Sequence, residues 1–185
     1  VSPTWVSYTT RTISKNSPAT VTFNCNGSGD CGFITAMGNG SADTYSGMRA
    51  TANSPFYVNV DVLADSQAGS YSSKGSVALG QRFLSAHYEA EAEDLGKFGD
   101  FISVMATQAG TTSVTFTKNN NNWLPSGVTT VNLQQGDSYI LSNETQNDSN
   151  IGTLITADQN IVVVSGSWSS VIGSTSSGGG RDMGL

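Results

Sequence analysis

Apolar residues along the chain come in short runs separated by turn residues, and no run keeps the 3.6-residue period of an amphipathic helix. The clearest run is 56–63, where valines at every second position from Val58 to Val62 alternate with an aromatic and two polar side chains. That two-residue period predicts a strand with one buried face. A weak helical pattern at 86–95 is the best competing signal. Strands are predicted at 5–13, 19–23, 32–37, 56–63, 77–79, 82–84, 101–105, 113–116, 128–133, 138–141, 152–156 and 161–164.

Many short strands joined by turns predict an all-β fold, an antiparallel β-sandwich built from two similar units of about 90 to 105 residues. The two units are suggested by a weak repeat. Segments 47–58 and 152–163 share a glycine, a Thr-Ala pair, an Asn or Asp and a following apolar strand. We therefore predict a first unit at 1–76 and a second, C-terminally truncated unit at 77–185, with the two segments in equivalent positions. A chance likeness in so repetitive a composition is the alternative.

Composition and charge narrow the class of protein. Ser and Thr make up about a quarter of the 185 residues and Gly adds 21, a composition typical of strands and tight turns. The net charge is −6 and no basic patch is present, which argues against nucleic acid and anionic membrane surfaces as partners. No apolar run approaches the roughly 20 residues of a membrane span. We expect an extracellular or cell-surface piece of a larger protein, without membrane insertion.

The two cysteines stand at either end of a glycine-rich loop. Cys25 and Cys31 are flanked by the predicted strands 19–23 and 32–37, so they lie at the neck of a predicted hairpin, within reach of a disulfide. Such a bridge would contribute about 2–3 kcal/mol and would imply an oxidising compartment. Two free thiols are the alternative, and two thiols are too few for a structural zinc site.

Residues able to carry catalysis are scarce. His87 is the only histidine, and no Gly-x-Ser-x-Gly turn accompanies it. The acidic stretch from Glu89 to Asp94 could gather around calcium, but a solvated acidic loop is the favoured interpretation. The sequence therefore predicts no enzyme, no cofactor and no catalytic residue. The weak calcium candidates are Glu89, Glu91, Glu93 and Asp94.

Four Asn-x-Ser/Thr sequons lie in turn-rich stretches, where a glycan could be attached. They begin at Asn26, Asn39, Asn143 and Asn147, and Asn39 is the preferred candidate. Asn26 lies within the predicted disulfide loop, where access is tight. Asn143 and Asn147 are too close together for both to carry a glycan easily.

The loop that contains Trp123 is a candidate for contact with a partner. Trp123 and Leu124 lie between four asparagines and a Pro-Ser-Gly turn, so an aromatic and an aliphatic side chain stand at the tip of a polar loop. Exposed there, they could anchor a partner. Packing of Trp123 back onto the sheet is the alternative.

Five strand motifs follow one another between residues 77 and 182. They are Ala78–Phe83, Phe101–Thr107, Thr111–Phe116, Leu133–Tyr139 and Gly152–Gly166. Their order and spacing resemble the N-terminal domain of IgGFc-binding protein, a family of secreted and surface proteins that includes mucus proteins. The resemblance implies a repeated β-sandwich region of a secreted adhesive or matrix protein. Many members place a cysteine soon after the last motif, where this chain has Ser167-Trp168-Ser169.

These features together predict a non-catalytic extracellular structural, adhesive or binding module of a larger secreted or surface protein. Its partner is expected to be a protein or glycan ligand, or copies of itself. A self-assembling filament or coat subunit is one alternative, favoured by low charge and by strand edges open to pairing. A carbohydrate-binding module is the other.

Overall fold

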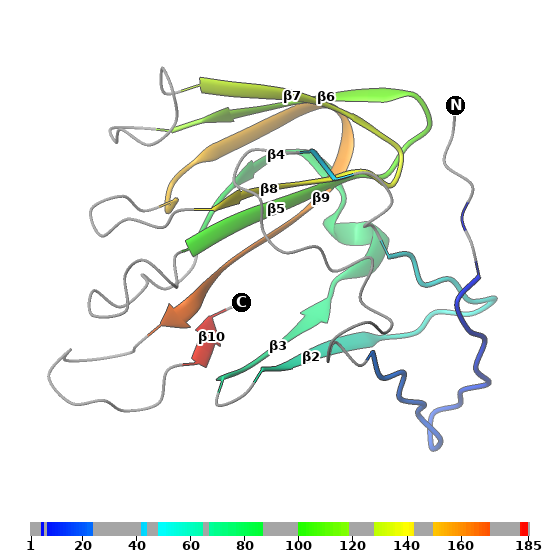
Figure 1. The fold of residues 1–185 in the computed structure, drawn as a ribbon. Helices are drawn as coiled ribbons and strands as arrows, with labels where there is room; N and C mark the ends of the chain where they lie inside the picture. Colours follow the sequence, from blue (N-terminus) through cyan, green and yellow to red (C-terminus); the bar gives the residue numbers. More distant parts are fainter. Residues whose placement is uncertain are drawn as a thin grey trace, which may run out of the picture.

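The computed structural model of the chain is all-β with antiparallel strands, which confirms the predicted fold class (Figure 1). The structure describes residues 5, 7–23, 42–43, 48–64, 67–86, 100–118, 128–142, 150–170 and 182–184. Its elements are β1 (Ala42–Asp43), β2 (Val58–Ala64), β3 (Gln67–Ser73), the 3₁₀ helix η1 (Gly75–Ala78), β4 (Gly80–Leu84), β5 (Asp100–Ala106), β6 (Thr111–Thr117), β7 (Val128–Gln134), β8 (Ser138–Ser142), β9 (Leu154–Ser170) and β10 (Asp182–Gly184).

Eight of these strands form one sheet, in the order β1-β8-β5-β9-β6-β7, with β4 and β10 also paired to β9. The long strand β9 changes partners along its length: residues 154–157 pair with β6 and residues 161–167 pair with β5. Both partners lie on the same edge of β9, because β4 occupies the opposite edge along 154–161. β5 and β6 therefore diverge at Asp158–Asn160, which we call the corner.

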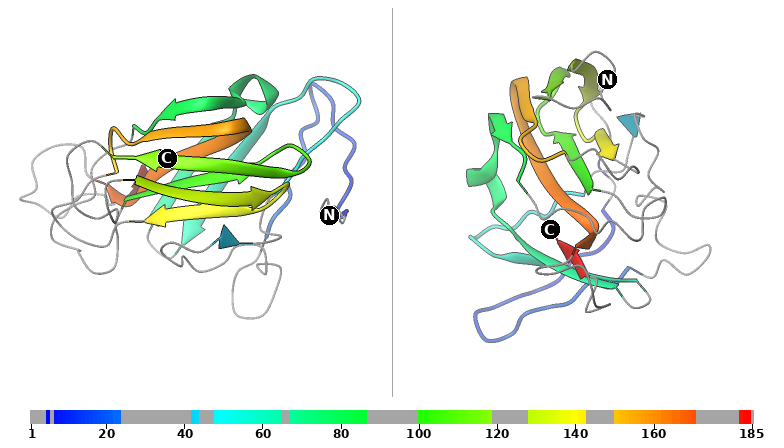
Figure 2. Two further views of the ribbon diagram at one scale, coloured as in Figure 1. Left: turned by 90° about the horizontal axis from the view of Figure 1, so that it is seen from above. Right: turned by 90° about the vertical axis from the view of Figure 1, so that its left-hand side faces the viewer.

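The sheet folds at the corner into two layers, β4-β9-β6-β7 and β10-β9-β5-β8-β1. A strand that passes from one sheet to the other in this way makes the corner of a sandwich. Figures 1 and 2 show β9, in orange, curving from one layer into the other.

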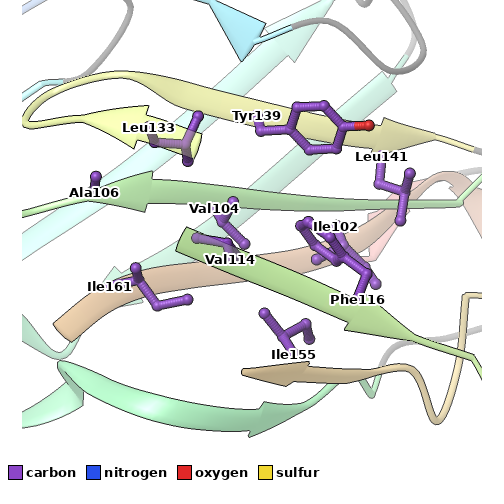
Figure 3. Packing of buried hydrophobic residues seen from close by; sticks show 10 residues of the cluster. All are labelled: Ile102, Val104, Ala106, Val114, Phe116, Leu133, Tyr139, Leu141, Ile155 and Ile161. Carbon is purple, nitrogen blue, oxygen red and sulfur yellow. The ribbon is translucent and has the colours of Figure 1, made fainter. Parts of the chain in front are cut away.

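A single apolar core fills the space between the layers (Figure 3). In β6 every second residue from Thr112 to Phe116 is buried, as a strand with one face on a core requires. The rings of Phe116 on β6 and Tyr139 on β8 lie 5.5 Å apart between centroids, so they join one layer to the other. The core residues are Ile102, Val104, Ala106, Val114, Phe116, Leu133, Tyr139, Leu141, Ile155 and Ile161.

Buried tyrosines make the fold sensitive to alkali. Burial raises the pKa of Tyr139 in the core and of Tyr71 on β3 above the ordinary value of 10.0. Their contribution to stability is therefore fully present below about pH 10 and is lost as the pH rises through the folded-state pKa. We expect the free energy of unfolding, measured by urea denaturation, to fall across this alkaline range. Tyr71→Phe with Tyr139→Phe should flatten the fall, and an unchanged slope would contradict this assignment.

β2 and β3 form a separate antiparallel hairpin, in which Val60 lies opposite Tyr71. The alternation predicted for 56–63 is confirmed: Val58 and Val60 are half-buried, while Tyr57, with 95% of its surface exposed, points away from them. β3 was not predicted, because Gln-Ala-Gly-Ser-Tyr-Ser-Ser has no apolar alternation. β10 contacts β3, so the hairpin lies beside the layer that contains β10 (Figure 1).

The strands predicted near the N-terminus are wrong in the described part of the chain. Residues 7–13 are exposed and form no strand, and the same holds for 19–22. Apolar alternation is not enough by itself, because a strand also needs a partner, and within the described residues neither stretch has a neighbouring strand. Their contacts are local: the rings of Tyr8 and Phe23 lie 5.0 Å apart, and the guanidinium of Arg49 lies 4.6 Å above the Trp5 ring.

Two more predictions are corrected by the structure. Residues 77–79 contain the end of the 3₁₀ helix η1 rather than a strand. The separate strands predicted at 152–156 and 161–164 are one strand, β9, because the polar corner residues between them form hydrogen bonds instead of a turn.

The two segments of the predicted repeat differ in local structure. Residues 154–163 all lie in β9, whereas the described residues 48–57 are largely exposed and precede β2 without forming a strand. The division of the chain into units at 1–76 and 77–185 stays a prediction.

Candidate binding surface

The outer face of the layer β4-β9-β6-β7 is the candidate binding surface, and the left view of Figure 2 looks onto this layer. Its side chains alternate with those that point into the core, and six of them carry a hydroxyl group. We call it the hydroxyl face. Its members are Arg82, Leu84, Thr111, Ser113, Thr115, Thr117, Thr130, Asn132, Gln134, Leu154, Thr156 and Asp158.

The strand register arranges these side chains in rows across the layer. One row runs from Thr130 through Thr115 and Thr156 to Arg82, each residue lying opposite the next. The Oγ1 atoms of Thr115 and Thr130 are 2.9 Å apart and share a hydrogen bond. In the row formed by Thr111 and Gln134, Gln134 Nε2 donates a hydrogen bond to Thr111 Oγ1 at 2.8 Å. Cross-strand hydrogen bonds therefore orient three of the six hydroxyl groups, those of Thr111, Thr115 and Thr130.

The row farthest from the corner is more apolar. Thr117 lies opposite Leu154, and Leu154 lies opposite Leu84, whose surface is 68% exposed. Ile151 is also exposed. The next residue, Gly152, is held beside the end of β4 by a hydrogen bond from its N–H to Ser85 O at 2.9 Å. This row therefore adds the apolar surface of Leu84 and part of Leu154 to the hydrogen-bonding groups of the other rows.

The hydroxyl face has few charges. Arg82 and Asp158 are its charged members, and the Asp158 carboxylate already accepts a hydrogen bond from Ser113 N at 2.9 Å. Interface centres are depleted in Lys, Glu and Asp, because desolvating an unpaired charge is costly. The face therefore has few charges that a partner would have to desolvate.

Hydrogen bonds hold the corner to two connections between the layers, the β5–β6 arch at 107–110 and the β7–β8 arch at 135–137. Thr107 Oγ1 donates to Asn160 O at 2.6 Å, and Gln135 Nε2 donates to Thr107 O at 3.0 Å. The β7–β8 arch turns through Gly136, whose φ of 87° is in the region that favours glycine, and Gly136 N donates to Ala106 O at 2.8 Å. These hydrogen bonds connect the corner to the ends of β5 and β7.

A second polar cluster, which we call the Ser85 clamp, ties the end of β4 to the start of β9. Ser85 Oγ donates to Asn150 O and accepts a hydrogen bond from Thr153 N at 3.0 Å. Thr153 N also reaches Asn150 O at 3.2 Å, and Gly152 has φ of 78°, as a type II turn requires. All three polar residues of the clamp are buried. The clamp fixes Leu84 and Leu154 at the apolar row.

The site residues predicted from sequence all lie outside the described residues, so the structure does not test them. This holds for the disulfide pair and the calcium candidates, for the sequons and for the Trp123 loop. Among the described residues, no group of three or more His, Cys, Asp or Glu could hold a metal ion. The untested residues are Cys25, Cys31, Asn26, Asn39, His87, Glu89, Glu91, Glu93, Asp94, Trp123, Leu124, Asn143 and Asn147.

Sequence reasoning missed the hydroxyl face. The signal was present in β6, where Thr111, Ser113, Thr115 and Thr117 occupy every second position. That alternation shows which side chains point away from the core. It does not bring β4, β7 and β9 to the same surface, which depends on the sheet order.

The fold and its exposed outer face define an all-β sandwich domain with a surface suited to binding. The family model described as IgGFc binding protein matches residues 68–184, from β3 to the end of β10, which is more than half of the chain. The chain therefore belongs to the IgGFc-binding family, as its strand motifs predicted. It matches no curated protein and no solved structure. No helix in the described ranges has the length and apolar character of a membrane span.

Proposed function

We propose that the chain is a non-catalytic extracellular binding module whose ligand is a protein and whose contact surface is the hydroxyl face. The observation that carries the proposal is the surface itself: four strands in register present rows of hydroxyl and amide groups, with two charged members, beside a row that contains the exposed Leu84. Membership of the IgGFc-binding family supports a binding role and an extracellular setting.

A protein ligand is favoured over a glycan by the side chains of this face. None of its members is aromatic, whereas sugar rings are commonly bound through stacking on aromatic side chains. Exposed Leu84 instead offers the aliphatic contact typical of protein interfaces. The family description makes the Fc fragment of immunoglobulin G the first protein probe.

An extracellular setting agrees with two predictions from sequence. A Cys25–Cys31 disulfide would form in an oxidising compartment, and Asn39 would then be open to glycosylation. Trp123 and Leu124 follow β6, whose last residue, Thr117, belongs to the apolar row. We propose that these two side chains also contact the protein ligand.

The test compares two variants with the same change in charge. Leu84→Glu with Thr117→Glu adds two negative charges to the apolar row, and both side chains are exposed, so the fold should persist. Tyr57→Glu with Val77→Glu adds the same charge at two positions, 95% and 88% exposed, outside this face. We expect the first variant to weaken binding of the Fc fragment at least about tenfold, a loss of about 1.4 kcal/mol, and the second to bind as the wild type does.

Two results would change the proposal. Absence of Fc binding, combined with a glycan-array hit that the first variant loses, would replace the protein ligand with a carbohydrate. Equal binding by both variants would remove the hydroxyl face as the contact surface.

A further inference from the structure

β7 is the last strand of the sheet order, and β6 is its only strand partner within the described residues. The β6–β7 ladder is regular: all seven residues from Val128 to Gln134 pair without a register shift. Thr130 and Asn132 are exposed, and Val131, which packs against the core, is half-buried. β7 therefore has a long, regular edge that faces away from β6.

The hydrogen bonds at the end of β7 show which backbone groups point away from β6. Gln134 N donates to Asp137 Oδ2 at 2.9 Å, so this amide is not directed at β6. On β6, Ser113 N donates to Asp158 Oδ1, on the β9 side, so the pair formed by Ser113 and Asn132 is not hydrogen-bonded. Because the pattern alternates along an antiparallel ladder, the N–H and C=O groups of Thr130 and Asn132 point outward.

The other outer edges of this sheet are protected against strand addition. β4 contains Arg82 and has a register shift between Gly80 and Arg82. β10 is three residues long with a register shift, and β1 has two residues. Charged residues, bulges and short length are the features that keep edge strands from pairing. β7, with the sequence Val-Thr-Thr-Val-Asn-Leu-Gln, has no charge, no proline and no bulge.

We propose that β7 pairs antiparallel with β7 of a second copy of this chain, in a closed two-fold dimer centred near Val131. The strand is self-complementary there, because it carries no charge and its polar Thr130 and Asn132 lie on either side of Val131. In this pairing, Thr130 of each copy lies opposite Asn132 of the other. Their outward N–H and C=O groups then form hydrogen bonds across the join between the two β7 strands. Among the described strands of the eight-stranded sheet, β7 has the one unprotected edge, so pairing through this edge stops at two chains rather than continuing to a filament. It does not depend on the proposed ligand.

The test is sedimentation velocity of the whole chain over a range of concentrations. Thr130→Lys with Asn132→Lys places like charges across the join, and we expect the dissociation constant of the dimer to rise at least about tenfold. Thr111→Lys with Thr117→Lys is the matched control, since it adds the same charge to exposed positions of the same face, on the interior strand β6. The control should dimerise as the wild type does.

Amide hydrogen exchange gives a second readout that needs no variant. In the wild type, exchange at the amides of Thr130 and Asn132 should slow as the concentration rises, while that at Val131, whose amide faces β6, should not change with concentration. A wild-type chain that stays monomeric at the highest concentration would overturn the proposal. So would a dimer that the β7 lysines leave intact, or one without protection at Thr130 and Asn132.

Discussion

Phe116→Ala is expected to lower the free energy of unfolding by about 3–5 kcal/mol. The Phe116 side chain is fully buried on β6, and its ring lies 5.5 Å from that of Tyr139 on the facing layer. Truncation removes apolar area and leaves a cavity between two layers that the shared strand β9 holds in place, so the site cannot collapse fully. Chemical denaturation followed by tryptophan fluorescence or circular dichroism measures the loss.

Thr117→Ala is the matched control for this substitution. Thr117 is the next residue on the same strand, but it is exposed on the opposite face, so its loss should change the free energy of unfolding by about 0.5 kcal/mol or less. If Phe116→Ala cost no more than this control, the two layers would not pack on each other as described.

Ser85→Ala is expected to cost about 0.5–1.5 kcal/mol for each of the two hydrogen bonds lost, because Thr153 N and Asn150 O still bond to each other at 3.2 Å. The substitution removes the donor to Asn150 O and the acceptor for Thr153 N, and both residues are fully buried. The start of β9 should loosen first, so amide exchange at Thr153 and Leu154 should speed up more than at Val163, in the middle of β9.

Ser70→Ala separates this effect from the general cost of losing a serine. Ser70 lies exposed on β3, outside the clamp, and its replacement should leave the stability nearly unchanged. A Ser85→Ala variant as stable as Ser70→Ala would show that the clamp contributes nothing to the fold.

The alternation of apolar and polar residues was enough to predict most strands of the sandwich. It located β2 and β4 to β8, because each of them contains a short run of apolar residues. It failed for β3, which consists mainly of small polar residues and is held by pairing with β2. Cross-strand pairing of this kind leaves no apolar period in the sequence.

The corner of β9 explains another failure. Asp158, Gln159 and Asn160 have the composition of a turn, so the pattern predicted two strands in place of one. Their polar groups form hydrogen bonds across the corner. The Asp158 carboxylate accepts from Ser113 N, Asn160 O accepts from Thr107 Oγ1, and Gln159 Nε2 donates to Thr111 O at 3.4 Å. These partners are 45 to 53 residues away in the sequence, beyond the reach of local pattern.

The candidate site was less predictable than the fold. Because histidine is scarce and no nucleophile motif is present, the candidates from sequence are the cysteines, the sequons and Trp123, which stand out by residue type. The hydroxyl face consists of common residues whose meaning comes from their position in rows across β4, β9, β6 and β7. The family was recognisable because the order of its strand motifs is a property of the sequence itself.

Nuclear magnetic resonance tests most directly whether the ligand contacts the hydroxyl face. The isotope-labelled chain is titrated with the Fc fragment, and loss of amide signal intensity is mapped onto the structure. We predict that the largest losses lie on the outer face, at Leu84, Thr115, Thr117 and Thr156, with the β2–β3 hairpin little affected. Losses concentrated at Tyr57, Asn59 and Asp61 of that hairpin segment, with the hydroxyl face unchanged, would contradict the account.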